Sequence, residues 1–131
     1  MRKEQVLKAL SALGFMTEEM EGFGYSFEYE GLTVFYTPEE EESGCVTLIA
    51  PNIYDIPDDD RMTALEIMVE LSGRIKYAQP YIMFDNRVWL KYQHYVGESE
   101  VTADLIEQMI RVLAYGTVLF GKIKREKDDE N

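Results

Sequence analysis

Cysteine and histidine, which often serve as nucleophiles, bases and metal ligands, are almost absent from this sequence. Its 131 residues include one of each, Cys45 and His94. A single cysteine cannot form an intramolecular disulfide, which favours a reducing compartment. A cysteine nucleophile with a histidine base would have to use this one pair, and a zinc site would lack ligands. We therefore expect a protein that is not an enzyme and holds no metal or cofactor.

Positively charged residues are also scarce, because 13 Lys and Arg stand against 25 Asp and Glu, a formal net charge of −12. Nucleic acids and anionic membrane surfaces both require clustered Lys and Arg, so both are disfavoured as partners. Basic or amphipathic protein segments fit the charge better. No apolar run approaches the roughly 20 residues that span a bilayer, and Glu4 interrupts any apolar signal after Arg2 and Lys3. We expect a cytoplasmic protein.

Two short motifs fit structural roles better than chemical ones. Gly22-Phe23-Gly24 has a GxG pattern, but it precedes an expected strand, whereas a phosphate-binding loop opens a helix. Asp55 and Asp58–Asp60 lack the spacing and the central glycine of a calcium loop, and they suit helix capping. Cys45 is expected as a small apolar residue opening a buried strand, and His94 as a core histidine hydrogen-bonded to a tyrosine or a carbonyl.

Three segments carry apolar residues at helical spacing and are predicted to be helices. The first covers residues 3–13 and ends at Gly14, which can adopt the left-handed conformation. The second ends at Gly73, and the third ends near Gly121. The third has two adjacent apolar rows, a wide stripe suited to lying across a sheet. Residues 122–131 are expected to form a charged, frayed tail.

Two hairpins and one short buried strand are predicted between these helices. The first hairpin has a two-residue turn at Glu30-Gly31, so that Tyr29 pairs with Leu32. Side chains alternate between the two faces of a strand. The same face as Tyr29 and Leu32 then carries the pairs Phe27–Val34 and Tyr25–Tyr36. The other face carries the pairs Glu28–Thr33 and Ser26–Phe35. The buried strand runs from Cys45 to Ala50 and is expected to end at Pro51.

The second hairpin is expected to turn at Asp85-Asn86 and to have an apolar back face. The pairing predicted for its core face is Met83–Val88 and Tyr81–Leu90, and for its back face Ile82–Trp89 and Phe84–Arg87. Pro80 has no N–H to donate, so a bulge or a longer turn is expected to shift this pattern. An apolar back face indicates that something packs there.

The order of elements is therefore α-β-β-β-α-β-β-α, with antiparallel connections at both hairpins. This order predicts an α+β fold, an antiparallel sheet with helices packed on it, because no strand–helix–strand alternation runs along the chain. Residues 1–131 are expected to form a single domain, since no linker or repeat interrupts them.

This small acidic chain resembles the YbjN-like proteins, a family assigned to bacterial sensory transduction regulation, within the type III secretion chaperone-like fold. The resemblance covers Lys3 to Gly121 and rests on three features: the element order, an opening helix that ends at Leu13-Gly14-Phe15, and a final helix after the Asp85-Asn86 hairpin. It implies a bacterial homodimer. In secretion chaperones the middle helix and the late strands commonly build the dimer, and outer apolar patches hold an extended partner segment.

We interpret the chain as a non-enzymatic, dimeric protein-binding module, chaperone-like or regulatory, that favours basic or amphipathic partner segments. The alternative is a small-ligand-binding regulatory domain with a tyrosine-lined concave face, made by Tyr25, Tyr29, Tyr36, Tyr81 and Tyr92. The residues predicted to form the dimer or partner interface are Met62, Met68, Ile82, Phe84 and Trp89.

Overall fold

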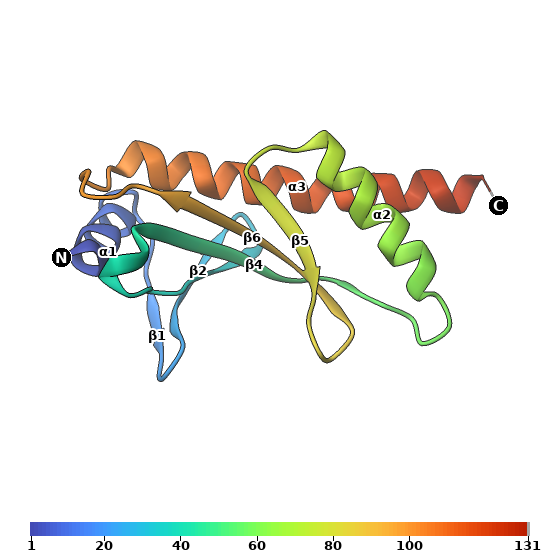
Figure 1. Cartoon of the computed structure of the whole chain (residues 1–131), viewed down its shortest axis with the longest axis horizontal. Coiled ribbons are helices and arrows are strands. Elements are labelled where there is room, and N and C mark those ends of the chain that lie inside the picture. The colour runs from blue at the N-terminus through green and yellow to red at the C-terminus, as the bar shows by residue number, and fades with distance from the viewer. Residues whose placement is uncertain (131) are drawn as a thin grey trace.

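The structure, a computed structural model, describes residues 1–130, with Glu41 described by its backbone alone. One antiparallel sheet has the strand order β1-β2-β3-β4-β6-β5 (Figure 1). The helices are α1 (Arg2–Ala12), α2 (Arg61–Arg74) and α3 (Ala103–Asp129), with a short 3₁₀ turn at Glu41–Ser43. The strands are β1 (Glu18–Met20), β2 (Gly24–Tyr29), β3 (Leu32–Tyr36), β4 (Cys45–Asp55), β5 (Ala78–Ile82) and β6 (Arg87–Tyr95). The α+β class and the antiparallel sheet are as predicted.

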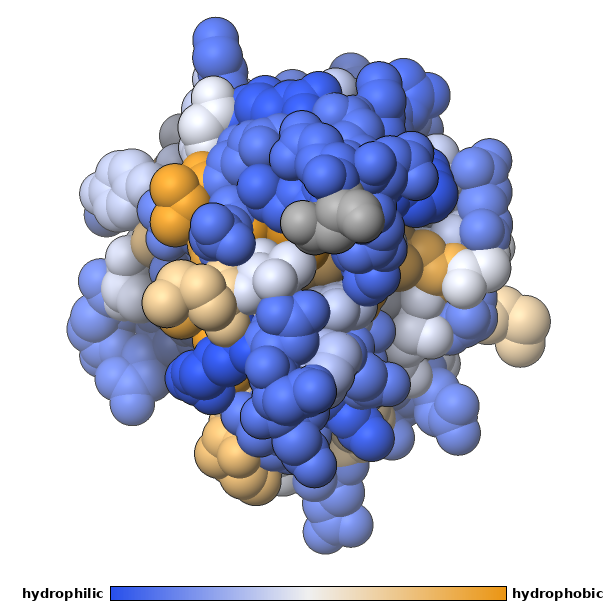
Figure 2. Space-filling model, turned by 90° about the vertical axis from the view of Figure 1, so that its right-hand side faces the viewer, coloured by the Kyte–Doolittle hydropathy of each residue, from blue (hydrophilic) through white to orange (hydrophobic). Residues whose placement is uncertain are grey.

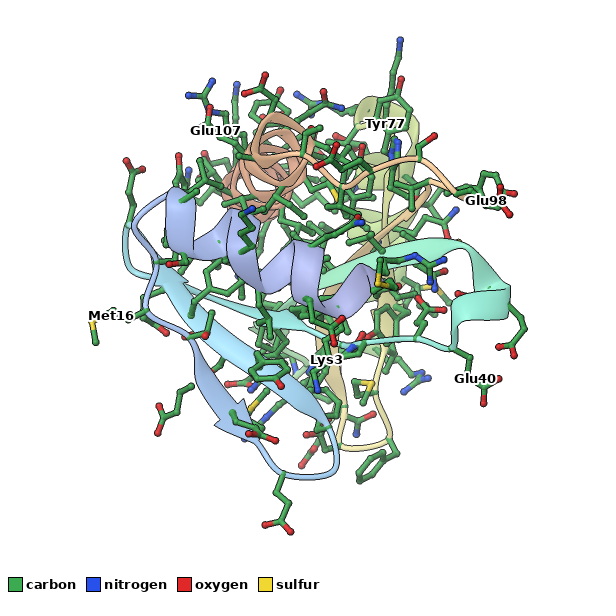
Figure 3. All side chains as sticks on the ribbon, turned by 90° about the vertical axis from the view of Figure 1, so that its left-hand side faces the viewer. Lys3, Met16, Glu40, Tyr77, Glu98 and Glu107 are labelled. Atoms are coloured by element: carbon green, nitrogen blue, oxygen red, sulfur yellow. The ribbon has the colours of Figure 1, made fainter. Side chains whose placement is uncertain are left out.

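The helices pack against one face of the sheet, and α3 lies along it (Figures 1 and 3). Alternate residues of β2, β3, β4 and β6 point to these helices and join one core with α1, α2 and α3. Gly116 lets α3 approach β6 closely, because a Cβ at this position would lie 2.7 Å from Leu90 Cδ2. Burial of the wide apolar stripe of α3 is therefore the main contact between the two layers.

The first hairpin has the predicted register, from Tyr29 opposite Leu32 to Tyr25 opposite Tyr36. Glu30 and Gly31 both adopt positive φ, 48° and 85°, as a tight two-residue turn requires. Strand β1, which was not predicted, has three residues and pairs antiparallel with β2 at the edge of the sheet.

The second hairpin has a longer turn than the two-residue turn at Asp85-Asn86. The Met83 N–H donates to the Arg87 carbonyl at 2.8 Å, and Asn86 has a φ of 61°. Hydrogen-bonded and non-hydrogen-bonded pairs alternate along an antiparallel ladder, starting here from the hydrogen-bonded pair of Met83 and Arg87. Pro80, opposite Leu90 on the edge strand β5, therefore lies in a non-hydrogen-bonded pair. The missing N–H of Pro80 therefore removes no ladder bond, and the conflict noted in the sequence is resolved.

This one-residue shift reverses the two faces of β5. Ile82 pairs with Val88 and lies on the helix side of the sheet, whereas Tyr81 pairs with Trp89 on the opposite side. The predicted back-face position of Ile82 and core-face position of Tyr81 were therefore wrong. Trp89 does lie on the back face, since it alternates with the buried Val88 and Leu90.

Two elements extend beyond their predicted ends. Strand β4 continues past Pro51 to Asp55, with an irregularity between Ala50 and Tyr54. Helix α3 continues past Gly121 to Asp129, because Ile123 is fully buried in the core. The frayed tail was therefore a wrong prediction for residues 122–129, and its last residue, Asn131, lies outside the described residues. Within those residues, no helix combines the length and the apolar character needed to cross a membrane.

Candidate functional site

The five residues predicted as an interface do not form one surface. Met68 and Ile82 are half-buried and pack against the core, so they contribute to folding. Met62 is exposed on α2, and Phe84 is 97% exposed in the turn between β5 and β6. Trp89 lies on the opposite face of the sheet from the core. The structure thus separates two apolar surfaces, one on the sheet and one on α2.

The sheet face that points away from the helices carries a continuous row of aromatic rings. The aromatic row consists of Phe23, Phe35, Trp89 and Tyr81, which come from the turn before β2 and from β3, β6 and β5. Successive ring centroids are 5.4, 5.8 and 6.3 Å apart, and each ring meets its neighbour edge to face. Phe35 and Trp89 were predicted on back faces, but neither was predicted to contact Phe23 or Tyr81.

Two neighbours, Ile49 and Asn52, hold the aromatic row in place. Ile49 pairs with Phe35 across β3 and β4 and is only 6% exposed, although it faces away from the main core. The Trp89 Nε1–H donates a 2.8 Å hydrogen bond to Asn52 Oδ1. Asn52 adopts a φ of 50° in the irregular part of β4, and this conformation favours Asn or Gly. The orientation of the indole ring is thus fixed by backbone geometry.

Charge changes sign from one edge of this face to the other. Near β5 and β6, Lys91 Nζ lies 5.2 Å from the centroid of the Tyr81 ring, a cation–π contact. Burial raises the pKa of the Tyr81 hydroxyl above its ordinary value. At the opposite edge, Glu18 lies on β1, and Glu28 on β2 accepts a 2.7 Å hydrogen bond from Thr33 Oγ1. The aromatic row is therefore a neutral centre between a basic and an acidic edge.

The second apolar surface is the outer face of α2. We call Met62, Leu65 and Val69 the α2 stripe; they are 68%, 38% and 73% exposed. Spacings of three and four residues place them on one side of the helix. With Glu66 and Glu70 they line a shallow hollow of about 350 Å³. Figure 2 views the molecule towards the C-terminal end of α3, where hydrophobic patches are separated by hydrophilic side chains.

Cys45 and His94 do not form a catalytic pair. They lie on neighbouring strands, where Val46 rather than Cys45 pairs with His94, so their side chains point to opposite faces. His94 Nδ1 lies 3.5 Å from the Tyr92 hydroxyl, in agreement with the expected contact to a tyrosine. Among the residues that the structure describes, no cluster of three or more His, Cys, Asp or Glu could hold a metal ion.

The tyrosine-lined concave face of the alternative interpretation is not present. Tyr36 and Tyr92 are buried in the core beneath the helices, with 2% and 0% exposure, and Tyr81 lies on the other face of the sheet. Burial raises the pKa of the Tyr92 hydroxyl, and a hydrogen bond from Gln108 partly opposes this effect. Tyr36 and Tyr92 therefore pack in the core, and the five tyrosines do not share one face of the sheet.

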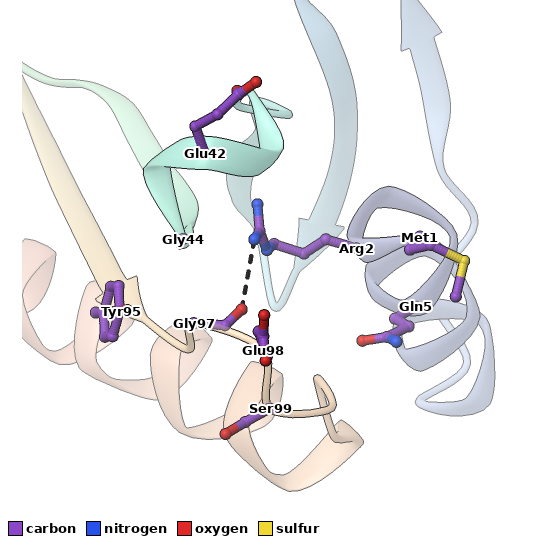
Figure 4. A pocket seen from close by; sticks show the side chains of 9 residues that line it. All are labelled: Met1, Arg2, Gln5, Glu42, Gly44, Tyr95, Gly97, Glu98 and Ser99. Carbon is purple, nitrogen blue, oxygen red and sulfur yellow. Dashed lines mark hydrogen bonds between the residues drawn. The ribbon is translucent and has the colours of Figure 1, made fainter.

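A hollow of about 550 Å³ lies beside the N-terminus (Figure 4). The guanidinium of Arg2 extends between two loops and donates to the carbonyls of Glu40 and Gly97, both at 3.5 Å. Glu42 and Glu98 also line the hollow, so it offers little to an anionic ligand. These contacts tie α1 to the loops around β4 and β6.

The chain has the fold of YbjN-like proteins and type III secretion chaperones. The crystal structure of YbjN, a proposed transcription regulator from E. coli, matches with a TM-score of 0.70 at 9% identity, over 95% of this chain and 92% of that one. The Yersinia pestis type III secretion chaperone SycH, in complex with a stable fragment of YscM2, matches with a TM-score of 0.64 at 11% identity, over 92% and 99%.

An uncharacterised protein from Methanothermobacter thermautotrophicus matches with a TM-score of 0.65 at 11% identity, over 97% of this chain and 99% of that one. No family model and no curated protein matches the sequence. Identities this low establish the fold alone, so function has to be argued from the surfaces.

Proposed function

We propose that this chain is a non-enzymatic, homodimeric protein-binding module, chaperone-like or regulatory, of the bacterial cytoplasm. The observation that carries the proposal is the aromatic row on the sheet face that points away from the helices. An antiparallel sheet with one face in water normally alternates apolar and polar residues cleanly, and contiguous exposed apolar surface marks a contact with another protein. SycH, which shares the fold, was crystallised with a protein fragment.

A second copy of the chain is the occupant that fits the aromatic row best. Two chains of charge −12 repel each other, so self-association favours a contact with few acidic groups at its centre. The four rings of the aromatic row carry no charge, and Arg87 beside them is paired with two carboxylates, Asp55 at 3.0 Å and Asp85 at 3.8 Å. A two-fold axis parallel to the strands would also place the basic edge at Lys91 over the acidic edge at Glu28 of the second copy.

Sedimentation equilibrium of the wild type and Trp89→Ala over a concentration series tests this proposal. We expect a wild-type dimer at tens of micromolar and at least tenfold weaker association for Trp89→Ala, because aromatic anchors dominate interface energies. Tyr115→Ala is the matched control, since Tyr115 is an exposed aromatic residue on α3. A strictly monomeric wild type, or a folded Trp89→Ala that associates like the wild type, would contradict the proposal.

A further inference from the structure

We infer that the outer face of α3 is a docking site for an acidic amphipathic helix of another protein. This inference rests on the proposed function as a protein-binding module, and it assigns the partner a surface and a chemistry. The aromatic row lies on the sheet face that points away from the helices, so the proposed dimer leaves the outer face of α3 uncovered (Figure 1).

One line of exposed side chains runs along the outer face of α3. Its members lie at spacings of three and four residues, which places them on one side of the helix. A rotation of about 100° per residue puts this side directly opposite the buried Gly116 and Phe120. We call the following exposed residues the α3 stripe: Arg111, Tyr115, Val118, Lys122 and Arg125.

The centre of the α3 stripe is apolar. Tyr115 and Val118 are 60% and 68% exposed. Val118 also borders a small hollow of about 150 Å³, which Tyr29 and Leu32 line from the first hairpin. The hollow offers room beside Val118 for an apolar side chain of a partner. Because the opposite side of α3 is anchored in the core, a partner does not have to order this helix when it binds.

The charge of the α3 stripe is opposite in sign to that of the whole chain. Residues 108–125 contain four Lys and Arg and no Asp or Glu, although the chain has a net charge of −12. Lys122 and Arg125 form no hydrogen bond or ion pair with any residue that the structure describes. The next residue on the same line is Asp129, so the positive charge ends at Arg125. Charges more than about 8 Å away are largely screened at physiological ionic strength, so these two cations dominate the charge that a partner meets there.

The other borders of the α3 stripe are less basic. Arg111 is paired with Glu107 at 3.1 Å, and Figure 3 shows Glu107 on the side of α3 that faces away from the sheet. Glu30 lines the small hollow. The unpaired positive charge therefore lies at one end of the α3 stripe, at Lys122 and Arg125. A partner that seats apolar side chains on the centre needs its carboxylates at that end.

A second copy fits the α3 stripe less well than an acidic helix does. Two copies of α3 could pack antiparallel about a two-fold axis, with Tyr115 of each copy over Val118 of the other. This packing would place Arg111 opposite Lys122 at both ends of the contact, and like charges oppose association. A helix with apolar residues at three- and four-residue spacings, followed by Asp or Glu one and two turns further on, matches both the apolar centre and the basic end.

Nucleic acids and anionic membranes also fit the α3 stripe less well. Tyr115 and Val118 separate Arg111 from the other two cations, so a run of phosphates would cross an apolar surface. A polyanion or an anionic bilayer would in addition meet the repulsion of a chain with a net charge of −12. A single acidic helix needs only a few carboxylates beside its apolar face.

The test uses a synthetic peptide of about 18 residues, five helical turns, with leucines on one face and glutamates beside them near one end. Its binding to the full chain is followed by fluorescence anisotropy. We expect saturable binding that Tyr115→Ala weakens by about tenfold, because aromatic anchors dominate interface energies. Tyr95→Ala is the matched control, since Tyr95 is an aromatic residue on β6 with 73% exposure, and it should leave binding unchanged.

The charge contribution is tested by removing one cation at a time. Lys122→Gln and Arg125→Gln are each expected to weaken binding by roughly two- to fivefold, as exposed ion pairs do. Lys8→Gln is the matched control, because it removes an exposed lysine on α1 and changes the net charge equally. A peptide with glutamine in place of every glutamate should bind the wild type and Lys122→Gln alike.

Four results would overturn the inference. The first is equal binding of the peptide to Tyr115→Ala and to Tyr95→Ala. The second is an equal loss in Lys122→Gln and in Lys8→Gln, which would indicate a response to the net charge alone. The third is weaker self-association of Tyr115→Ala in sedimentation equilibrium, which would make a second copy the occupant. The fourth is binding of a single-stranded oligonucleotide or of phosphatidylserine vesicles by a wild type that does not bind the peptide.

The same measurements separate this inference from the proposed dimer. A wild-type dimer that fails to bind the peptide would overturn this inference alone. A monomer that binds the peptide would overturn the dimer proposal alone.

Discussion

The aromatic row and the α2 stripe are both apolar, but they differ in exposure and in their charged surroundings. Three of the four rings in the aromatic row are half-buried, whereas every side chain of the α2 stripe is exposed. The aromatic row lies between a basic edge at Lys91 and an acidic edge at Glu28, so its charges can complement those of a second copy. The α2 stripe is bordered on one flank by Glu66 and Glu70, and Glu70 is paired with Arg74 at 3.1 Å. The comparison shows that two surfaces of similar apolar character differ in the charges at their borders, and such charges decide which partner an apolar surface favours.

A charge placed in the aromatic row should have the largest effect on self-association, because it tests directly whether this surface is the seam. We expect Phe35→Asp to weaken self-association by at least a hundredfold, because the new carboxylate would be buried without a partner between two copies. Sedimentation equilibrium of Phe35→Asp and the wild type over one concentration series measures the effect.

The control for this substitution is Val118→Asp, which adds the same charge at an exposed position on α3. Circular dichroism and the unfolding midpoint show whether Phe35→Asp is folded, since Phe35 is half-buried beside Ile49. A folded Phe35→Asp with wild-type self-association would remove the aromatic row from the dimer seam.

Reversing the edge charges should give a smaller effect. Lys91→Glu and Glu28→Lys are each expected to weaken self-association by roughly fivefold, since exposed ion pairs contribute up to about 1 kcal/mol. The double variant should recover most of the wild-type affinity, because the two edges then exchange signs and still complement each other. Sedimentation equilibrium of all four proteins forms a double-mutant cycle. Losses that simply add in the double variant would exclude the proposed overlap, in which Lys91 of one copy lies over Glu28 of the other.

The fold could be predicted where short-range constraints were strong. Glu30-Gly31 matches the positive φ angles of a two-residue turn, and that turn sets the register of the whole first hairpin. Asp85-Asn86 indicated the same type of turn, but the observed loop places only Asn86 at positive φ, and the register shifted by one residue. Pro80 indicated that the predicted register of this hairpin was wrong, because that register required an N–H that proline lacks.

The candidate site could be predicted only in part. Trp89 and Phe35 were placed correctly on back faces from alternation alone. The aromatic row joins four segments far apart in the sequence, so it depends on the order in which the strands lie side by side. Hairpin turns determine the pairing of adjacent strands, but they do not determine that β4 lies between β3 and β6. The exposure of Val69 and Leu65 likewise required knowing which side of α2 faces the core.

Tyr81 provides the smallest expected effect and links the aromatic row to pH. Burial raises the pKa of Tyr81 above its ordinary 10.0, so the neutral phenol is favoured in the folded chain. A dimer that buries the ring further raises this pKa again. The contribution of Tyr81 to association is therefore complete below its pKa in the single chain, which already lies above 10.0, and it is lost as the pH rises through its higher pKa in the dimer. Self-association should therefore decline above about pH 10 in the wild type and less steeply in Tyr81→Phe.

Sedimentation equilibrium at a series of alkaline pH values measures this difference, and tyrosinate absorbance in the same samples reports the titration. Tyr54 and Tyr92 also have pKa values raised by burial, but they lie on the helix side of the sheet, so their ionisation lowers fold stability in both proteins alike. The difference between the wild type and Tyr81→Phe isolates the aromatic row. Equal pH dependence of self-association in the two proteins would show that Tyr81 lies outside the seam and would confine the contact to Phe23, Phe35 and Trp89.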